Sequence, residues 1–159
     1  MKPTVYIETS VVSYLTSRPS RDLIAAARQE RTVSWWEHHE KFYTVYISDL
    51  VNDEAAEGDS DAAVRRMSAM AGLPVLAVTD AAVSLADRVL DSGLVPQQAA
   101  ADALHVAVAA LNNMDYLLTW NCKHLANAAI RRSLEEVVTE AGFYCPVICT
   151  PEELSESQS

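Results

Sequence analysis

Short apolar runs that do not alternate with polar residues recur along the chain, separated by segments with helical spacing. Such runs are typical of strands that are covered on both faces of a sheet. The clearest is 5–7, which is rich in β-branched and aromatic residues and breaks off abruptly into Glu8, Thr9 and Ser10. The same reading predicts further strands at 43–47, 74–78, 115–119 and 146–150.

The segments between these runs have the capping residues and apolar spacing of helices. Helices are predicted at about 20–40, 49–57, 59–70, 80–91, 96–112 and 127–141. Ser48 and Thr79 are the expected N-caps of two of them, and Pro96 suits the first turn of another. Because strands that alternate with helices form parallel sheets, we expect one α/β domain over 1–154 and a flexible, Ser/Glu-rich tail at 155–159.

Length and composition agree with an ordinary domain that buries its own core. The chain has 159 residues, half of them apolar, and three cysteines whose spacing fits neither a disulfide framework nor a zinc site. The first strand follows the N-terminus directly, which leaves no room for a signal peptide, and no apolar run is long enough to span a bilayer. We therefore expect a reduced, cytoplasmic protein without membrane association.

Acidic residues outnumber basic ones by 22 to 12, which gives a formal net charge of −10. Such a charge repels phosphate backbones and argues against broad electrostatic binding to nucleic acid. A local basic strip remains open, because Arg18, Arg21, Arg28 and Arg31 are close in sequence. Concentrated acid also suits hard divalent cations, so composition alone leaves both possibilities.

Two polar residues, Glu8 and Asn121, come directly after predicted strands. The carboxyl ends of parallel strands meet at one edge of the sheet, and ligands bind at that edge in open α/β folds. Each residue also has a purely structural interpretation. Glu8, Thr9 and Ser10 could be a polar turn in which Ser10 caps a short helix, and Asn121 could be a turn amide.

Asp102 lies on a segment that is apolar nearly all the way round, about six residues past a helix start near Pro96. That position is too deep for a cap, and a buried carboxylate needs a cation, a hydrogen-bond donor or a metal. Two alternatives remain: the helix begins at Asp102, or His105, one turn further on, pairs with it. His105 itself is interpreted as a packing or hydrogen-bonding residue.

Glu54 shares a helix face with Leu50 and is expected to face partly inward, whereas Asp53 is expected to be solvated. Glu57 is the alternative to Glu54. If Glu8, Glu54 and Asp102 converge, their mutual repulsion calls for a divalent cation, and oxygen ligands favour Mg²⁺ or Mn²⁺ over zinc. Such metals activate water in phosphoryl-ester cleavage.

Four of these segments, taken in order along the chain, together resemble the PIN domain family, and within it the VapC-type toxins of bacterial toxin–antitoxin pairs. The segments are 5–10, 50–54, 101–105 and 117–121. The resemblance implies a three-layer α/β/α sandwich around a central, mainly parallel sheet. It also implies Mg²⁺- or Mn²⁺-dependent endoribonuclease activity on RNA phosphodiesters, a homodimer and often a cognate antitoxin that blocks the site.

The resemblance also implies roles for single residues. Glu8, Glu54 and Asp102 fall on the metal-holding acids, and Asn121 falls on a fourth catalytic position that is often Asp in the family. The first acid is usually Asp as well. Thr9 or Ser10 matches the small hydroxyl residue beside it, and both are candidate substrate contacts. Apart from the resemblance, Lys123 or the Arg18–Arg31 segment could contact the RNA backbone, and the alternative for both is a solvated charge.

Two further interpretations stay open at this stage. The chain could be a PIN-like binding module whose catalysis has faded and which acts through protein partners. The feature to watch is Trp35-Trp36, because adjacent helical residues point about 100° apart, so one ring could lie at a partner contact. The other interpretation is a DNA-directed nuclease of the same fold.

Overall fold

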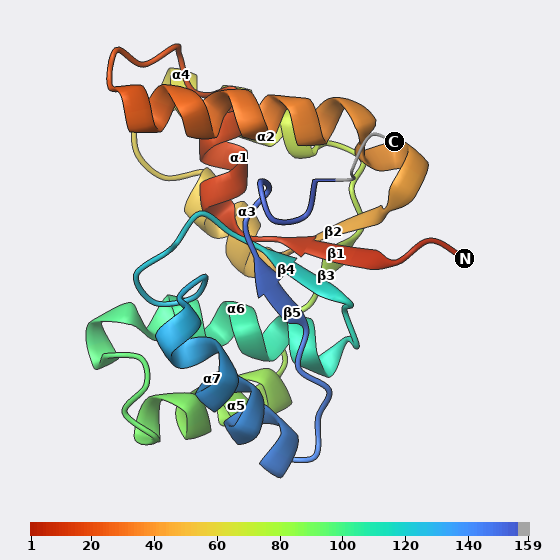
Figure 1. The fold of residues 1–159 in the computed structure, drawn as a ribbon, viewed down its shortest axis with the longest axis vertical. Helices are drawn as coiled ribbons and strands as arrows, with labels where there is room; N and C mark the ends of the chain where they lie inside the picture. Colours follow the sequence, from red (N-terminus) through yellow and green to blue (C-terminus); the bar gives the residue numbers. More distant parts are fainter. Residues whose placement is uncertain (156–159) are drawn as a thin grey trace.

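The protein is built around a five-stranded parallel sheet, seen nearly edge-on in Figure 1. The computed structural model describes residues 1–155, so the expected tail, apart from Ser155, lies outside the described residues. The strands lie in the order β3-β2-β1-β4-β5. Their bounds are β1 Thr4–Ile7, β2 Thr44–Ser48, β3 Val75–Leu76, β4 Tyr116–Leu118 and β5 Val147–Cys149.

Helices cover both faces of this sheet. Helices α1, α2 and α4 lie on one side and α5, α6 and α7 on the other, which confirms the predicted three-layer α/β/α sandwich (Figure 1). A short 3₁₀ turn, Gln97–Ala99, precedes α6. The helices are α1 Thr9–Thr16, α2 Leu23–Phe42, α3 Asp49–Ala55, α4 Ser60–Met70, α5 Asp80–Asp91, α6 Ala100–Leu111 and α7 Ala128–Glu140.

The central strand β1 is buried on both faces, as its unbroken apolar pattern predicted. Val5, Tyr6 and Ile7 have no exposed surface. Strand β1 pairs with β2 on one side and with β4 on the other. Because Tyr6 carries a hydroxyl into this core, it needs a hydrogen-bond partner there.

Most of the predicted helix starts are confirmed by their caps. The hydroxyl of Ser48 accepts the N–H of Val51, and that of Thr79 accepts the N–H of Ala82. Capping side chains satisfy backbone donors that have no partner inside the helix. The capping residues in the sequence therefore identified these two helix starts correctly.

Two predicted boundaries are wrong. The third strand is limited to two residues rather than five, because only Val75 and Leu76 pair with β2. The helix expected to begin near Pro96 begins at Ala100, because Pro96 is extended and starts the separate 3₁₀ turn. Asp102 therefore lies in the first turn of α6 and not six residues into the helix, although it is not the N-cap.

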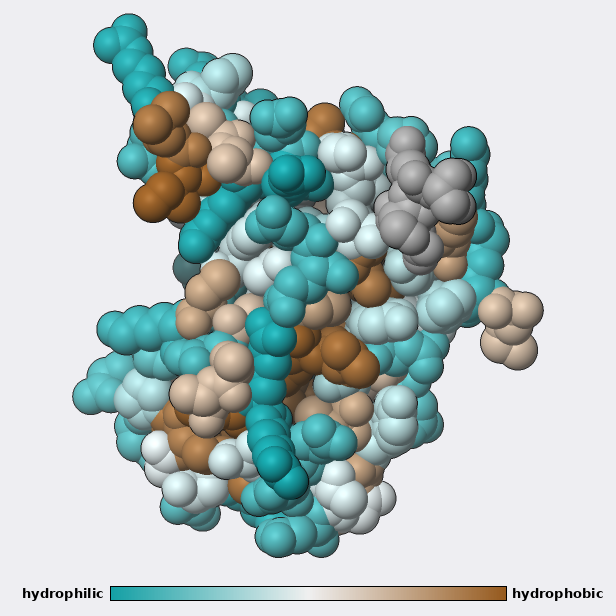
Figure 2. All heavy atoms as spheres, viewed as in Figure 1, coloured by the Kyte–Doolittle hydropathy of each residue, from teal (hydrophilic) through white to brown (hydrophobic). Residues whose placement is uncertain are grey.

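The topology marks one edge of the sheet for ligand binding. From β1 the chain moves outward through β2 and β3, then returns to the other side of β1 for β4 and β5. The segments that leave β1 and β4 therefore turn toward opposite layers, and the crevice between them is where open α/β sheets bind ligands. Figure 2 shows the surface notched between the two helical layers at this edge.

In the part of the chain that the structure describes, no helix combines the length and the apolar character needed to cross a bilayer.

Candidate functional site

Glu8 leaves the end of β1 and is held by three hydrogen bonds. One carboxylate oxygen, Oε2, accepts the N–H of Ser10 at 3.0 Å. The other, Oε1, accepts the hydroxyls of Ser10 at 2.5 Å and Thr119 at 2.6 Å. Glu8 itself is therefore the N-cap of α1, and Ser10 fixes its carboxylate instead of capping the helix. Only 7% of Glu8 is exposed, so its orientation is set by these contacts.

Glu54 reaches the same edge from α3. Its Oε1 accepts the hydroxyl of Thr9 at 2.6 Å and the Nε2–H of His105 at 2.7 Å. Since both donors converge on Oε1, Oε2 is left for another ligand. Glu57 is exposed beyond the end of α3, with its carbonyl bound by Arg66. Glu54, and not Glu57, therefore lies at this edge of the sheet.

His105 on α6 begins a chain of buried hydrogen bonds. Its Nδ1 lies 2.6 Å from the hydroxyl of Tyr6, which lies 2.8 Å from Oγ of Ser48. Burial raises the pKa of Tyr6, which keeps its hydroxyl protonated. A neutral imidazole with its proton on Nε2 satisfies every atom: Ser48 donates to Tyr6, Tyr6 donates to Nδ1, and Nε2–H donates to Glu54.

This arrangement settles how His105 is used. The alternative in which it pairs with Asp102 is wrong, because hydrogen bonds to Tyr6 and Glu54 occupy both ring nitrogens. The expectation of a buried hydrogen-bonding residue is confirmed, with 1% of the side chain exposed.

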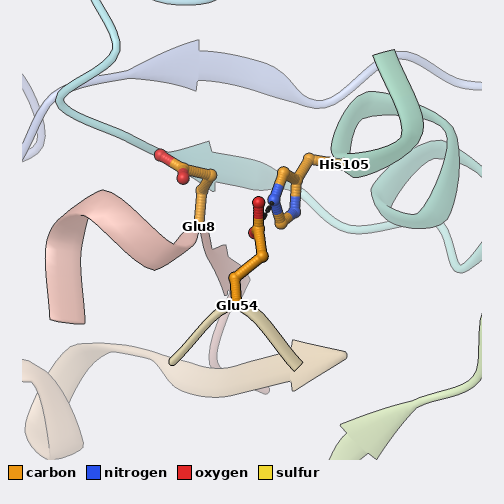
Figure 3. A group of neighbouring side chains, drawn as sticks. All are labelled: Glu8, Glu54 and His105. Atoms are coloured by element: carbon orange, nitrogen blue, oxygen red, sulfur yellow. Dashed lines mark hydrogen bonds and ion pairs between the residues drawn. The ribbon is translucent and has the colours of Figure 1, made fainter. Parts of the chain in front are cut away.

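Three side chains from different elements converge here, as Figure 3 shows for Glu8, Glu54 and His105. One potential ligand atom from each lies within 4.8 Å of the others. They come from the end of β1, from α3 and from α6. These elements are far apart in sequence and meet only because β1 lies in the middle of the sheet.

Asp102 and Asn121 complete this edge. The side-chain amide of Asn121 donates a hydrogen bond to Asp102, while its Oδ1 accepts the N–H of His124 at 3.0 Å. Asn121 is thus a turn amide that also orients an acid. The backbone N–H of Asn121 donates to Thr119, whose hydroxyl reaches Glu8, so the two predicted acids are linked through one short segment.

The carboxylates respond differently to burial. For Glu54, burial acts to raise the pKa, but the hydrogen bonds that its carboxylate accepts from His105 and Thr9 act against it, so the pKa is lowered. For Asp102, burial and the charge of Glu8 raise the pKa despite the hydrogen bond from Asn121. Ionisation of Asp102 is therefore less favourable in the folded protein than it is in a free aspartate.

The donor set fits a hard divalent cation. The carboxylates of Glu8 and Glu54 lie together, and Oε2 of Glu54 is left for a ligand. Asp102 is near enough to Glu8 that burial and the charge of Glu8 raise its pKa. Both nitrogens of His105 are already engaged, so the available ligands are oxygens. Oxygen ligands of this kind suit Mg²⁺ or Mn²⁺.

Other predicted residues have more limited support. Thr9 and Ser10 bind the carboxylates of Glu54 and Glu8, and Lys123 is exposed beside Asn121. Their contact with substrate remains a prediction.

The Trp35-Trp36 pair lies away from this edge, on α2. Trp35 is buried in the core, and Trp36 is partly buried against it. Trp36 also stacks on His39. Neither ring is therefore an exposed anchor of the kind that would mark a binding module.

Sequence reasoning missed the residues that support the acids: Tyr6, Ser48 and Thr119. All three are fully buried polar residues, within or directly after strands. A signal was present, because a polar atom in a doubly covered strand must find a partner. Its partner could not be named without the order of the strands.

Known structures share this architecture. One is a chain of the VapBC2 complex from Rickettsia felis, described as bound to a DNA fragment from its promoter. It is 13% identical, with a TM-score of 0.59 over 92% of this chain and 98% of that one. Another is VapC20 of Mycobacterium tuberculosis, described as a toxin that cleaves the sarcin–ricin loop. It is 17% identical, with a TM-score of 0.52 over 87% and 95%.

No family model and no curated protein matches the sequence. At these low identities the similarity establishes the fold and not the activity. The chain has the PIN-like fold of VapC toxins, which confirms the resemblance seen in the sequence.

Proposed function

We propose that this chain is a Mg²⁺- or Mn²⁺-dependent endoribonuclease that hydrolyses RNA phosphodiesters, and that it is the toxin of a toxin–antitoxin pair. The observation that supports the proposal is the cluster of Glu8 and Glu54, with Asp102 near enough to Glu8 for that charge to raise its pKa. The shared fold with toxins of this class supports it, since one of them is described as cleaving the sarcin–ricin loop. A cognate antitoxin, a homodimer and a cytoplasmic location belong to the same proposal.

Each residue has a part in this chemistry. Glu8, Glu54 and Asp102 would hold the cation, and Asn121 keeps the carboxylate of Asp102 in place. When bound, the metal would supply an activated water and would neutralise charge on the phosphate. His105 donates to Glu54 and so keeps it ionised and oriented. Glu8, which is one methylene longer than Asp, caps α1 by accepting the N–H of Ser10.

The test uses two glutamates three residues apart. Glu54→Gln removes a charge from the candidate site, and Glu57→Gln removes the same charge from the exposed surface. Loss of an outer-shell partner weakens metal sites by roughly 10–100-fold. Loss of a direct ligand such as Glu54 should cost at least as much in Mn²⁺-dependent cleavage of an RNA panel and should abolish growth arrest on expression.

Glu57→Gln should retain both activities. If Glu54→Gln behaves like Glu57→Gln, or if the unaltered protein cleaves no RNA in the panel, the proposal is wrong. The panel also includes single- and double-stranded DNA. Cleavage of DNA but not of RNA would identify the chain as a DNA-directed nuclease instead.

A further inference from the structure

Arg28 on α2 is held over two aromatic rings. Its guanidinium carbon lies 5.9 Å from the ring centre of Tyr14 and 5.3 Å from that of Trp120. These distances are typical of cation–π contacts. Its hydrogen bonds are long, at 3.4 Å to the hydroxyl of Tyr14 and 3.9 Å to the sulfur of Cys122. The side chain is thus fixed in place without a strong acceptor.

Arg28 also has no carboxylate partner among the described residues, although the chain is strongly acidic. Arg31, Arg131 and Arg132 each have a glutamate within 4.0 Å. A guanidinium has five N–H donors in a fork that matches phosphate or carboxylate. Arg28 therefore keeps most of its donors available for an anion.

The aromatic base beneath Arg28 is rigid. Trp120 is 7% exposed, and its indole N–H donates to Thr32 at 2.7 Å. The hydroxyl of Thr32 in turn donates to the backbone carbonyl of Arg28 at 2.6 Å. The ring of Tyr14 packs edge-on against Trp120. Because these contacts order the arginine in advance, little conformational freedom would be lost when it binds an anion.

This cluster adjoins the acidic pocket. The backbone N–H of Trp120 donates to Oγ of Ser10 at 2.8 Å, and that hydroxyl donates to Glu8. Asn121, which orients Asp102, is the next residue along the chain. Arg28 is therefore seated on the same short segment, 119–121, that holds Glu8 and Asp102 in place, so an anion bound to it would lie along the approach to the acidic pocket.

We propose that Arg28, held by Tyr14 and Trp120, binds a phosphate of the substrate strand next to the phosphodiester that is cleaved. This inference rests on the proposed RNA hydrolysis and specifies how the strand is held. It also explains how a chain with a net charge of −10 can bind RNA. Binding depends on one preorganised guanidinium and not on the overall field.

The experiment compares Arg28→Gln, Arg28→Lys and Arg132→Gln in the full chain. Arg132 on α7 is 92% exposed in its side chain, so its replacement removes the same charge far from the pocket's aromatic cluster. We measure KM and kcat with a short single-stranded RNA, and Kd against salt concentration in the Glu54→Gln background. Thermal unfolding checks that each variant is folded.

Arg28→Gln should raise KM and Kd by roughly 10-fold, the scale of a lost charged hydrogen bond, with a smaller change in kcat. The slope of log Kd against log salt should fall by about 0.7, the value for one phosphate contact on a single strand. Arg28→Lys should restore the slope but not the full affinity, because it keeps the charge and loses the fork. Arg132→Gln should change neither the Kd nor the salt slope.

The inference is overturned if Arg28→Gln and Arg132→Gln have the same Kd and the same salt slope while the unaltered protein cleaves RNA. In that case the proposed function stands and only the role of Arg28 fails. If the unaltered protein neither binds nor cleaves RNA, the proposed function fails and the role of Arg28 fails with it.

Discussion

A single hydroxyl, that of Tyr6, connects the middle of the sheet to the candidate site. It lies between Ser48 at the end of β2 and His105 on α6, with no exposure to solvent. Its removal leaves one buried donor and one buried acceptor without partners, which typically costs about 1–3 kcal/mol. The packing of the aromatic ring would be retained.

Tyr6→Phe should therefore lower the free energy of unfolding by about 1–3 kcal/mol, measured by urea denaturation. Tyr46 is the matched control, because it pairs with Tyr6 in the sheet and its hydroxyl makes no hydrogen bond within the described residues. Tyr46→Phe should be nearly neutral. Equal losses in the two variants would contradict the hydrogen-bond chain.

Asp102 is a second residue whose replacement has a predictable sign. Its pKa is raised in the folded state, so the folded protein binds this proton more tightly than the unfolded chain. The stability contributed by the protonated carboxyl of Asp102 is present at acidic pH and is lost as pH rises through the raised pKa. At neutral pH, without metal, Asp102→Asn should therefore have a higher Tm than the unaltered protein.

The comparison is made in EDTA by thermal unfolding from about pH 4 to pH 7.5, which spans the ordinary carboxyl range. The advantage of Asp102→Asn should shrink toward acidic pH, where Asp102 is protonated in both states. An advantage that is constant with pH would mean that the charge of Asp102 is not the cause.

At the scale of elements, local patterns predicted the helices and strands well where the chain's own neighbours decide them. Ser48 and Thr79 cap their helices as expected, because a cap is a hydrogen bond between a side chain and a backbone N–H only three residues further along the chain. The errors at Pro96 and at β3 have a different origin. The extent of β3 is decided by its pairing with β2, and the start of α6 by a 3₁₀ turn that a helical pattern does not distinguish.

The turn after β5 offers a prediction at this scale. Arg131 on α7 donates two hydrogen bonds to Glu153, at 3.0 and 2.9 Å, and the N–H of Thr150 donates a third. These contacts, that of Arg131 foremost, lower the pKa of Glu153 against a smaller opposing effect of burial. They join the C-terminal turn to α7.

Because the pKa of Glu153 is depressed by folding, its stabilising contribution is present above the unfolded value and is lost as pH falls through the folded one. Glu153→Gln should lower the Tm at pH 7, by an amount that disappears in acid. The pair is partly exposed, so the effect is on the order of 0.5 kcal/mol.

Glu136 provides the control for this measurement. It lies 3.9 Å from Arg132 on the exposed side of α7, and a surface pair of that kind contributes little. A pH-dependent loss of Tm as large in Glu136→Gln as in Glu153→Gln would show that general surface charge, and not the C-terminal contact, is responsible.

At the scale of the whole molecule, sequence patterns identify candidate acids but not how they are arranged. Glu8 and Asn121 could be placed because the ends of parallel strands share an edge. The role of His105 could not, because its partners Tyr6 and Glu54 are 99 and 51 residues away in sequence. Only the strand order β3-β2-β1-β4-β5 brings them together.

A divalent cation should stabilise the whole fold if the acids hold it. Binding to the folded state alone contributes about 2.7 kcal/mol when the metal is present at 100 times its Kd. Mn²⁺ or Mg²⁺ should therefore raise the Tm of the unaltered protein, measured by calorimetry, and raise that of Asp102→Asn much less. An equal rise in both would place the cation away from Asp102.

The position of β4 beside β1 has a consequence for the order in which the protein acquires activity during synthesis. Glu8 and Glu54 are made before Asp102, Asn121 and the strand β4 that pairs with β1, all of which lie beyond residue 100. An unfinished chain still attached to the ribosome has half a pocket. Whatever reaction this pocket performs must wait until translation has passed Asn121, so an inhibitor can be in place before the chain becomes active.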